Sequence, residues 1–320
     1  MCRASGTEIE YYSDITEKAV EWLWYPFIPY GKITLLQGDP GDGKSTFMLH
    51  VAASITTGSQ LPDGSQSKGI QNVIYQCSED SSSDTIKPRL IQAGADCDRV
   101  AYINEDKRPL TIGDPRIEEA VIRTGARLLI IDPIQAYMPH DCDMTNASSM
   151  RALMKNLAAL ADRHKCAVVL IGHMTKANGG KNLYRSFGSI DITAIARSVL
   201  MIKRDDDNPE IRYMFPVKSS LAYEGCAVRF MFTKELGLQM LGACSIESKD
   251  DSHEQLEGKG KSAKAERILK ELLSCGDMPS KSVISVLKDK GISERTVRSA
   301  AKSIGVKATR KDNAWHWSMP

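Results

Sequence analysis

The chain has 320 residues, of which 42% are hydrophobic and 26% charged, with a formal net charge of +2, and this length suggests one large or two smaller domains. No apolar run approaches the about 20 residues that a membrane span needs, and residues 1–5 lack the apolar core of a signal peptide, so we expect a cytoplasmic protein without a membrane segment. Its eight cysteines include no C-x-x-C pair and no histidine at zinc spacing, so we expect free thiols, no disulfide and no structural metal.

Strand and helix patterns alternate through the first two thirds of the chain. Strands are predicted at 33–37, 72–77, 100–103, 128–132, 167–173, 198–204, 211–217 and 228–233. Helices are predicted at 44–57, 84–93, 115–124, 148–164 and 190–196. Several strands are continuously apolar, as strands buried on both faces are. The pattern predicts a mostly parallel, doubly wound α/β sheet with active groups at the carboxyl ends of its strands.

Residues 38–46 read Gly-Asp-Pro-Gly-Asp-Gly-Lys-Ser-Thr and match the phosphate-binding loop G-x-x-x-x-G-K-[ST] at each fixed position. A glycine-rich turn with an incidental lysine is the alternative, which the flanking strand and helix disfavour. Such a loop points backbone N–H groups at a polyphosphate near the positive end of a helix. We expect Lys44 to contact the β- and γ-phosphates of ATP and Ser45 to ligate Mg²⁺. The predicted nucleotide-binding residues are Gly38, Asp39, Pro40, Gly41, Asp42, Gly43, Lys44, Ser45 and Thr46.

Two strand ends supply the carboxylates that hydrolysis needs. Asp132 ends an apolar strand and is predicted to hold Mg²⁺, directly or through water. Many P-loop ATPases carry Glu directly after this Asp, but here Pro133 follows. We therefore predict that Glu79, at the end of the strand 72–77, is the catalytic base. We expect that strand to neighbour the strand of the phosphate loop; the alternative is that Glu79 and Asp80 form a helix N-cap pair.

His173 ends the strand 167–173, where it could sense the γ-phosphate and transmit its loss to the next loop; a purely structural histidine is the alternative. That loop, 174–186, is basic and carries one aromatic residue, as a loop that grips a nucleic-acid backbone would. A surface loop without function is its alternative, and the neighbouring loop 138–146 is acidic. The predicted DNA-binding residues of the loop are Lys176, Lys181 and Arg185.

A basic residue of one subunit often completes the ATP site of its neighbour in ring ATPases. Candidates for this role in trans are Arg197, Arg204 and Lys218. Each could equally be a solvated or paired surface charge.

The C-terminal segment 259–320 contains fourteen Lys/Arg and six Asp/Glu residues, a net charge of +8, which leaves −6 for 1–258. After a polar linker at 245–262, helices are predicted at 263–274, 281–290 and 294–304, followed by a hairpin over 306–318. This order is that of a winged helix-turn-helix domain, 263–320, behind an ATPase domain, 1–244. On the third helix one basic stripe is predicted to contact DNA, although winged helices also bind proteins. The stripe consists of Arg295, Arg298 and Lys302.

Together these elements resemble the RepA-type branch of the hexameric RecA-like replicative helicases, over roughly residues 15–240. The resemblance rests on 38–45, on Ser78-Glu79-Asp80 with Arg89-Leu90, on 128–132, on Ile171-Gly172-His173, and on Phe187-Gly188-Ser189-Ile190 running to Arg197. It implies a RecA-like P-loop NTPase fold, Glu79 as catalytic base, Asp132 as the Mg²⁺ residue and His173 as sensor. It also implies a phosphate-linked role for Arg89, and a homo-hexameric ring with ATP between subunits and single-stranded DNA in its channel.

The sequence thus predicts an ATP-hydrolysing, Mg²⁺-dependent RecA-like ATPase of DNA metabolism, and specifically a ring-forming DNA helicase. The alternative is an ATP-switched regulatory protein of a mobile element that binds duplex DNA and does not unwind it. A small-molecule kinase is disfavoured, because nothing resembles an acceptor lid and the basic tail would have no role.

Overall fold

The computed structural model forms two compact units, Met1–Ser245 and Ile246–Pro320. It describes residues 11–139, 147–173, 190–205, 208–222, 226–233, 237–244, 265–266, 268–269, 272–273, 277–289, 292–311 and 314–318. No helix within these ranges is both long and apolar enough to cross a membrane.

The first unit is built on a nine-stranded sheet in the order β11-β10-β9-β8-β3-β7-β6-β4-β5. The six strands from β8 to β5 run parallel, and β9, β10 and β11 extend the sheet with antiparallel pairing. The predicted α/β fold with a mostly parallel central sheet is confirmed. The strands are β3 (Ile33–Gly38), β4 (Asn72–Cys77), β5 (Val100–Ala101), β6 (Ala126–Asp132), β7 (Ala167–His173), β8 (Ser198–Arg204), β9 (Ile211–Ser219), β10 (Ala227–Thr233) and β11 (Gly237–Cys244).

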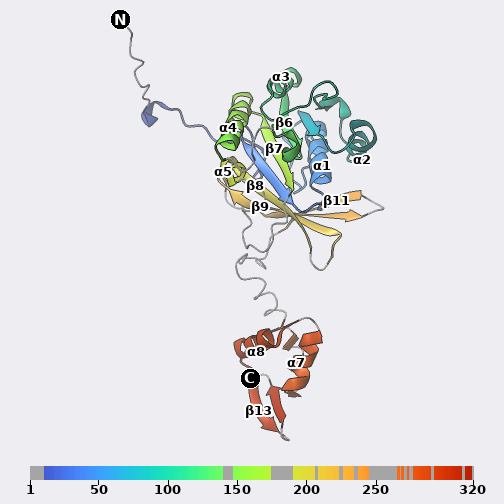
Figure 1. Ribbon diagram of the computed structural model, residues 1–320, viewed down its shortest axis with the longest axis vertical. Coiled ribbons are helices and arrows are strands. Elements are labelled where there is room, and N and C mark those ends of the chain that lie inside the picture. Colours follow the sequence, from blue (N-terminus) through green and yellow to red (C-terminus); the bar gives the residue numbers. More distant parts are fainter. Residues whose placement is uncertain are drawn as a thin grey trace. The chain divides into compact units, whose positions relative to one another are not determined.

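Helices cover both faces of this sheet, with α1 and α2 on one side of the central strands and α4 and α5 on the other (Figure 1). Each face of the sheet carries its own hydrophobic core, and alternate residues of each central strand belong to one core or the other. Tyr75 packs with α1 and α2, whereas its neighbour Ile74 packs with α3 and α4. This alternation follows from the period of two in a strand. The helices are α1 (Lys44–Thr57), α2 (Lys87–Gln92), α3 (Pro115–Thr124), α4 (Ala147–His164) and α5 (Ile190–Ile195).

A cluster of aromatic side chains packs around the N-terminal turns of α1. The hairpin of β1 (Trp22–Trp24) and β2 (Ile28–Pro29) precedes β3. Its Trp24 is 1% exposed and stacks on Phe47 of α1 with 6.2 Å between ring centroids. Phe47 in turn contacts Phe230 of β10 at 4.9 Å. The first turns of α1 are therefore held between the N-terminal hairpin and the antiparallel part of the sheet.

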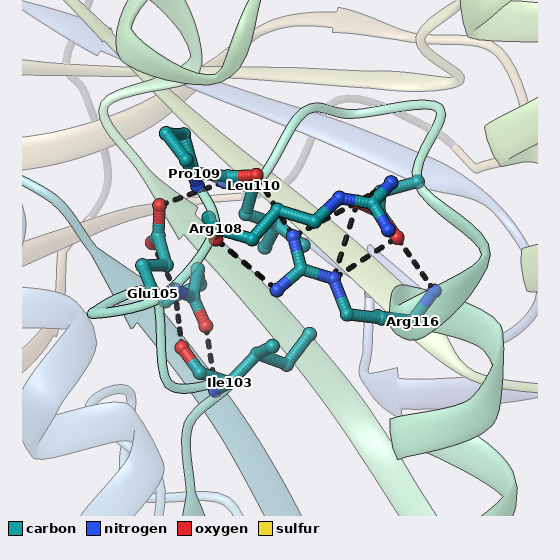
Figure 2. Close-up of polar contacts among 8 residues, drawn as sticks. Ile103, Glu105, Arg108, Pro109, Leu110 and Arg116 are labelled. Atoms are coloured by element: carbon teal, nitrogen blue, oxygen red, sulfur yellow. Dashed lines mark hydrogen bonds and ion pairs between the residues drawn. The ribbon is translucent and has the colours of Figure 1, made fainter.

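The loop after β5 is tied to the end of β4 by side chains. The amide of Gln76 accepts a hydrogen bond from the Ile103 N–H (2.9 Å) and donates to the Ile103 carbonyl (3.1 Å). Glu105 accepts hydrogen bonds from Gln76, from the Tyr137 hydroxyl (3.1 Å) and from the Leu110 N–H (3.0 Å); Figure 2 shows this carboxylate turned toward the loop. The predicted strand 100–103 is therefore too long, since Ile103 pairs with a side chain instead of the next strand.

Arg116 fastens the other end of the same loop. Its guanidinium donates to the carbonyls of Arg108 (3.2 Å) and Pro109 (2.8 Å) and pairs with Asp114 at 2.9 Å (Figure 2). Asp114 also caps α3 by accepting from the Arg116 N–H. The hydrogen bonds and charge of Arg116, with Arg108 nearby, hold the pKa of the Asp114 carboxyl below its usual value.

This depressed pKa predicts a pH-dependent contribution to stability. Because the carboxyl has a lower pKa in the folded chain than the about 3.9 of an unfolded Asp, it stabilises the fold above about pH 4. That contribution is lost as the pH falls through the folded-state pKa. We expect Asp114→Asn, which keeps a capping oxygen, to lower the free energy of unfolding at pH 7 and to differ less from wild type near pH 3. Denaturant unfolding at both values measures this.

The exposed Asp98 provides a control, and Asp98→Asn should have no comparable effect at either pH. Equal loss of stability by Asp114→Asn at pH 7 and pH 3 would contradict the assignment.

Two further elements of the first unit differ from the prediction. The helix predicted at 84–93 begins instead with a π-helical turn, Ser82–Ile86, capped by Ser81, and α2 starts only at Lys87. Pro88 in its first turn lacks the N–H that a longer regular helix would need. Strand β11 was not predicted, because Gly237 and Gly242 interrupt its apolar pattern.

The second unit has its own core of helices packed against a three-stranded antiparallel sheet in the order β12-β14-β13. The described residues between 265 and 273 are helical. Ser293 caps α8 by accepting from the Thr296 N–H. The short strand β12, which pairs with β14, was not predicted. The elements are β12 (Met278–Pro279), α7 (Ser280–Asp289), α8 (Glu294–Ser303), β13 (Lys307–Lys311) and β14 (Ala314–Ser318).

Candidate active site

The loop between β3 and α1 wraps around the ammonium group of Lys44. The Lys44 Nζ donates to the carbonyls of Gly38 (2.8 Å) and Asp39 (2.9 Å), and the residue is 3% exposed. Burial lowers the pKa of Lys44, and the carboxylates of Asp42, Asp132, Asp39 and Glu79 oppose this shift. A buried cation thus lies at the N-terminus of a 14-residue helix, which is the electrostatic arrangement that binds a polyphosphate.

Two positions of the loop need glycine, because a Cβ there would lie too close to neighbouring atoms. A Cβ on Gly38 would lie 2.6 Å from the Ile202 carbonyl oxygen of β8. A Cβ on Gly41, whose φ is +80°, would lie 2.9 Å from the Arg204 guanidinium. The loop is therefore packed directly on the end of β8.

Asp42 and Arg204 connect the loop to β8. The Asp42 carboxylate accepts from the Asp39 N–H (2.9 Å) and from Arg204 Nε (3.0 Å). Arg204 also donates to the Gly41 carbonyl. Arg204, predicted as a candidate in trans, thus contacts the phosphate loop of its own chain. Opposite it on β9, the buried Arg212 adds a second positive charge near Gly43.

Beneath the loop, Ser45, Tyr75 and Asp132 lie together. Asp132 is 3% exposed, and its Oδ2 accepts a hydrogen bond of 2.6 Å from the Tyr75 hydroxyl. The Ser45 side chain lies close enough to this hydroxyl to affect its pKa. The structure therefore brings together both residues that the sequence predicts for Mg²⁺, although they come from α1 and β6.

Glu79 follows β4, but this strand does not neighbour the strand of the phosphate loop, so that expectation is wrong. In the sheet, β7 and β6 lie between β3 and β4. Glu79 is exposed at the carboxyl edge of the sheet and is still close enough to Lys44 to raise its pKa. The N-cap that follows is Ser81, so the alternative interpretation of Glu79 and Asp80 as a capping pair is also wrong.

His173 is the last residue of β7, and its backbone is in register with Gly38 of β3. This places residue 173 beside the first residue of the phosphate loop. The DNA-binding candidates Lys176, Lys181 and Arg185 lie outside the described residues, as do positions 140–146 of the acidic loop.

The remaining basic candidates have different surroundings. Arg89 pairs with Asp80 at 2.8 Å. Lys218 donates to three carbonyls at the end of α5, those of Thr193, Ala194 and Ala196. Arg197 is exposed and close enough to Lys218 to lower its pKa, an effect second to that of burial. The role of each in trans stays a prediction.

Two residues of the site were missed from sequence. Tyr75 lies two positions before the end of a predicted strand, and nothing local indicates which face of the sheet it occupies. Arg204 was considered only for a neighbouring subunit. Its contact with Asp42 joins residues that are 162 positions apart, so only the sheet order reveals it.

The residues present fit a Mg²⁺–nucleotide complex. Mg²⁺ is usually bound by one or two protein oxygens together with phosphates and waters. A hydroxyl and a buried carboxylate lie under the loop, and the described residues contain no cluster of three His, Cys, Asp or Glu side chains that could hold a metal alone. Ser45 and Asp132 are therefore the groups that would hold this ion, and Lys44 the group that would contact phosphate.

Comparisons with known proteins agree with this site. DNA repair protein RadA of Streptococcus pneumoniae is 30% identical over 148 residues, which are 46% of this chain and 31% of the relative. RadA of Mycobacterium tuberculosis is 28% identical over 149 residues, or 46% of this chain and 28% of the relative. The matched region thus spans about a third of the length of these relatives.

Among solved structures, the "ATPase Domain of G40P" matches with a TM-score of 0.48 and 15% identity, over 64% of this chain and 83% of that chain. The model of the AAA domain matches residues 6–179, which contain the phosphate loop, Glu79, Asp132 and His173. Since this match covers more than half of the chain, the protein belongs to the AAA domain family.

Proposed function

We propose that this protein hydrolyses ATP and acts as a ring-forming DNA helicase of the RepA type. The observation that carries the proposal is the cluster at the carboxyl edge of the sheet. There Lys44 and Ser45 open α1, Asp132 lies under them, and Glu79 stands near Lys44. This combination contains each group that phosphoryl transfer to water needs.

Each side chain has a distinct task in the proposed reaction. Lys44 and the N-terminus of α1 bind and orient the phosphates. Mg²⁺, when bound at Ser45 and Asp132, supplies charge neutralisation for the phosphate oxygens. Glu79 orients the attacking water and accepts its proton. His173, beside Gly38 at the end of β7, is proposed to report the state of the site to the segment that follows it.

DNA is the proposed partner for two reasons. The relatives RadA are named as DNA repair proteins. In addition, Arg295, Arg298 and Lys302 are exposed on α8, while Val297 and Ala301 of the same helix are buried. We interpret the second unit as a winged helix-turn-helix domain with α8 as its recognition helix.

The exposed basic side of α8 also favours a second function, that of an ATP-switched regulator that binds a duplex site without unwinding it. In α8 the charge of Arg298 is partly offset, because Glu294 pairs with it at 2.9 Å. The two functions differ in the expected effect of DNA. Single-stranded DNA is expected to stimulate the ATPase of a helicase, whereas a regulator is expected to bind duplex DNA without such stimulation.

The deciding experiment measures the ATPase rate with and without single-stranded DNA, alongside the solution mass. The helicase proposal expects stimulation by DNA, loss of that stimulation on deletion of residues 174–186, and a mass about six times the 35.3 kDa of one chain. Sequence-specific duplex binding that survives this deletion, with no stimulation, would favour the regulator. Absence of Mg²⁺-dependent ATP hydrolysis would contradict both.

A further inference from the structure

Tyr75 occupies an unusual position for a core aromatic residue. It is 2% exposed and packs with α1 and α2 on one face of the sheet. Its hydroxyl does not reach solvent but donates to Asp132 Oδ2 at 2.6 Å, and the Ser45 side chain lies close to the same hydroxyl. One phenol group therefore contacts the carboxylate that is predicted to hold Mg²⁺ and lies beside the second predicted ligand.

The hydrogen bond between Tyr75 and Asp132 has a fixed direction. A phenol has one proton, and Tyr75 gives it to the Oδ2 atom of Asp132. Carboxylate oxygens are what a hard cation binds, so the direction in which this carboxylate is held decides where such a cation can be bound.

Packing alone does not require the hydroxyl. Val73, the preceding residue of β4 on the same face, is fully buried in the same apolar cluster and carries no polar group. A phenylalanine would fill the volume of the Tyr75 ring equally well. The hydroxyl adds its hydrogen bond to Asp132, which is a residue of the site.

We propose that Tyr75 is a positioning residue that holds the Asp132 carboxylate in place for the Mg²⁺ of a bound nucleoside triphosphate. The proposal rests on the proposed ATPase function. Groups that hold a metal ligand in place typically change metal affinity by about 10–100-fold when they are removed. Without the phenol, Asp132 loses the donor that holds its Oδ2 atom.

The test is Tyr75→Phe in the full chain, with binding of a fluorescent ATP analogue followed during a Mg²⁺ titration. We expect the half-saturating Mg²⁺ concentration to rise about 10-fold, while binding of the analogue in excess EDTA stays as in wild type. Tyr30→Phe is the matched control, because Tyr30 is a buried tyrosine whose hydroxyl donates to Gln71 at 2.8 Å, outside the site. Its Mg²⁺ midpoint should match wild type.

A second measurement avoids mutation of Tyr75 should the variant fold poorly. In protein labelled with 3-fluorotyrosine, the ¹⁹F resonance of Tyr75 should shift when Mg²⁺ is added to the nucleotide complex, whereas that of Tyr30 should not. An unchanged Mg²⁺ midpoint in folded Tyr75→Phe, or an unshifted Tyr75 resonance, would overturn the positioning role and leave the ATPase proposal intact. Wild-type protein that binds no nucleotide with Mg²⁺ would overturn the proposed function and this role with it.

Discussion

Glu79→Gln is expected to lower the rate of ATP hydrolysis by about 10²–10⁴-fold while ATP binding is retained. Glutamine keeps the size of the side chain and can still hydrogen-bond water, but it cannot accept a proton. Glu79 follows β4 at the edge of the sheet where Lys44, Ser45 and Asp132 converge. Steady-state phosphate release measures the rate, and equilibrium titration with a fluorescent ATP analogue measures binding.

The matched control is Asp84→Asn, which neutralises another exposed carboxylate of the same segment. It lies in the π-helical turn after Ser81, where its Oδ1 accepts from the Thr85 hydroxyl. This variant should keep the wild-type rate. Hydrolysis at the wild-type rate by Glu79→Gln would remove Glu79 from the role of catalytic base.

Lys44→Ala is expected to weaken ATP binding by about 10²–10³-fold, as the loss of one nearby unit charge at intermediate dielectric predicts. The Lys44 ammonium is buried within the loop, and four carboxylates are near enough to affect its pKa. Without this cation the loop presents carbonyl oxygens and negative charge to a polyanion. Isothermal titration calorimetry with ATP and Mg²⁺ measures the change.

Lys32→Ala serves as its control, because Lys32 precedes the same strand but is only half-buried and pairs with Asp162 at 3.2 Å. Its ATP affinity should equal that of wild type. If Lys44→Ala bound ATP as tightly as wild type, the loop would not be the phosphate site.

Whether a feature of this protein can be predicted from its sequence depends on how far apart in the chain the residues that determine it lie. The bounds of α1 and α3 depend on residues within one turn or two, and their predictions are confirmed. The order of strands depends on pairing between segments far apart in the chain. For that reason the strand of Glu79 was predicted beside β3, whereas β7 and β6 intervene.

The same reasoning explains which site residues were missed. Alternation along β4 indicates that Tyr75 and Gln76 face opposite sides, but which side carries α1 is decided by the whole sheet. Tyr75 therefore reaches Asp132, and Gln76 reaches the loop at Ile103. Polar contacts of this kind are specific to the assembled fold and leave no signal in local sequence.

The aromatic cluster at the N-terminal turns of α1 has a consequence for the intrinsic tryptophan fluorescence of the protein. Of its four tryptophans, two lie in each unit. Trp24 is 1% exposed and stacked on Phe47, three residues after Lys44, whereas Trp315 is 55% exposed in the C-terminal unit. Indole emission is blue-shifted in dry surroundings and red-shifted in water. The fluorescence spectrum of the unlabelled chain therefore combines blue components from the buried Trp22, Trp24 and Trp317 with a red component from Trp315.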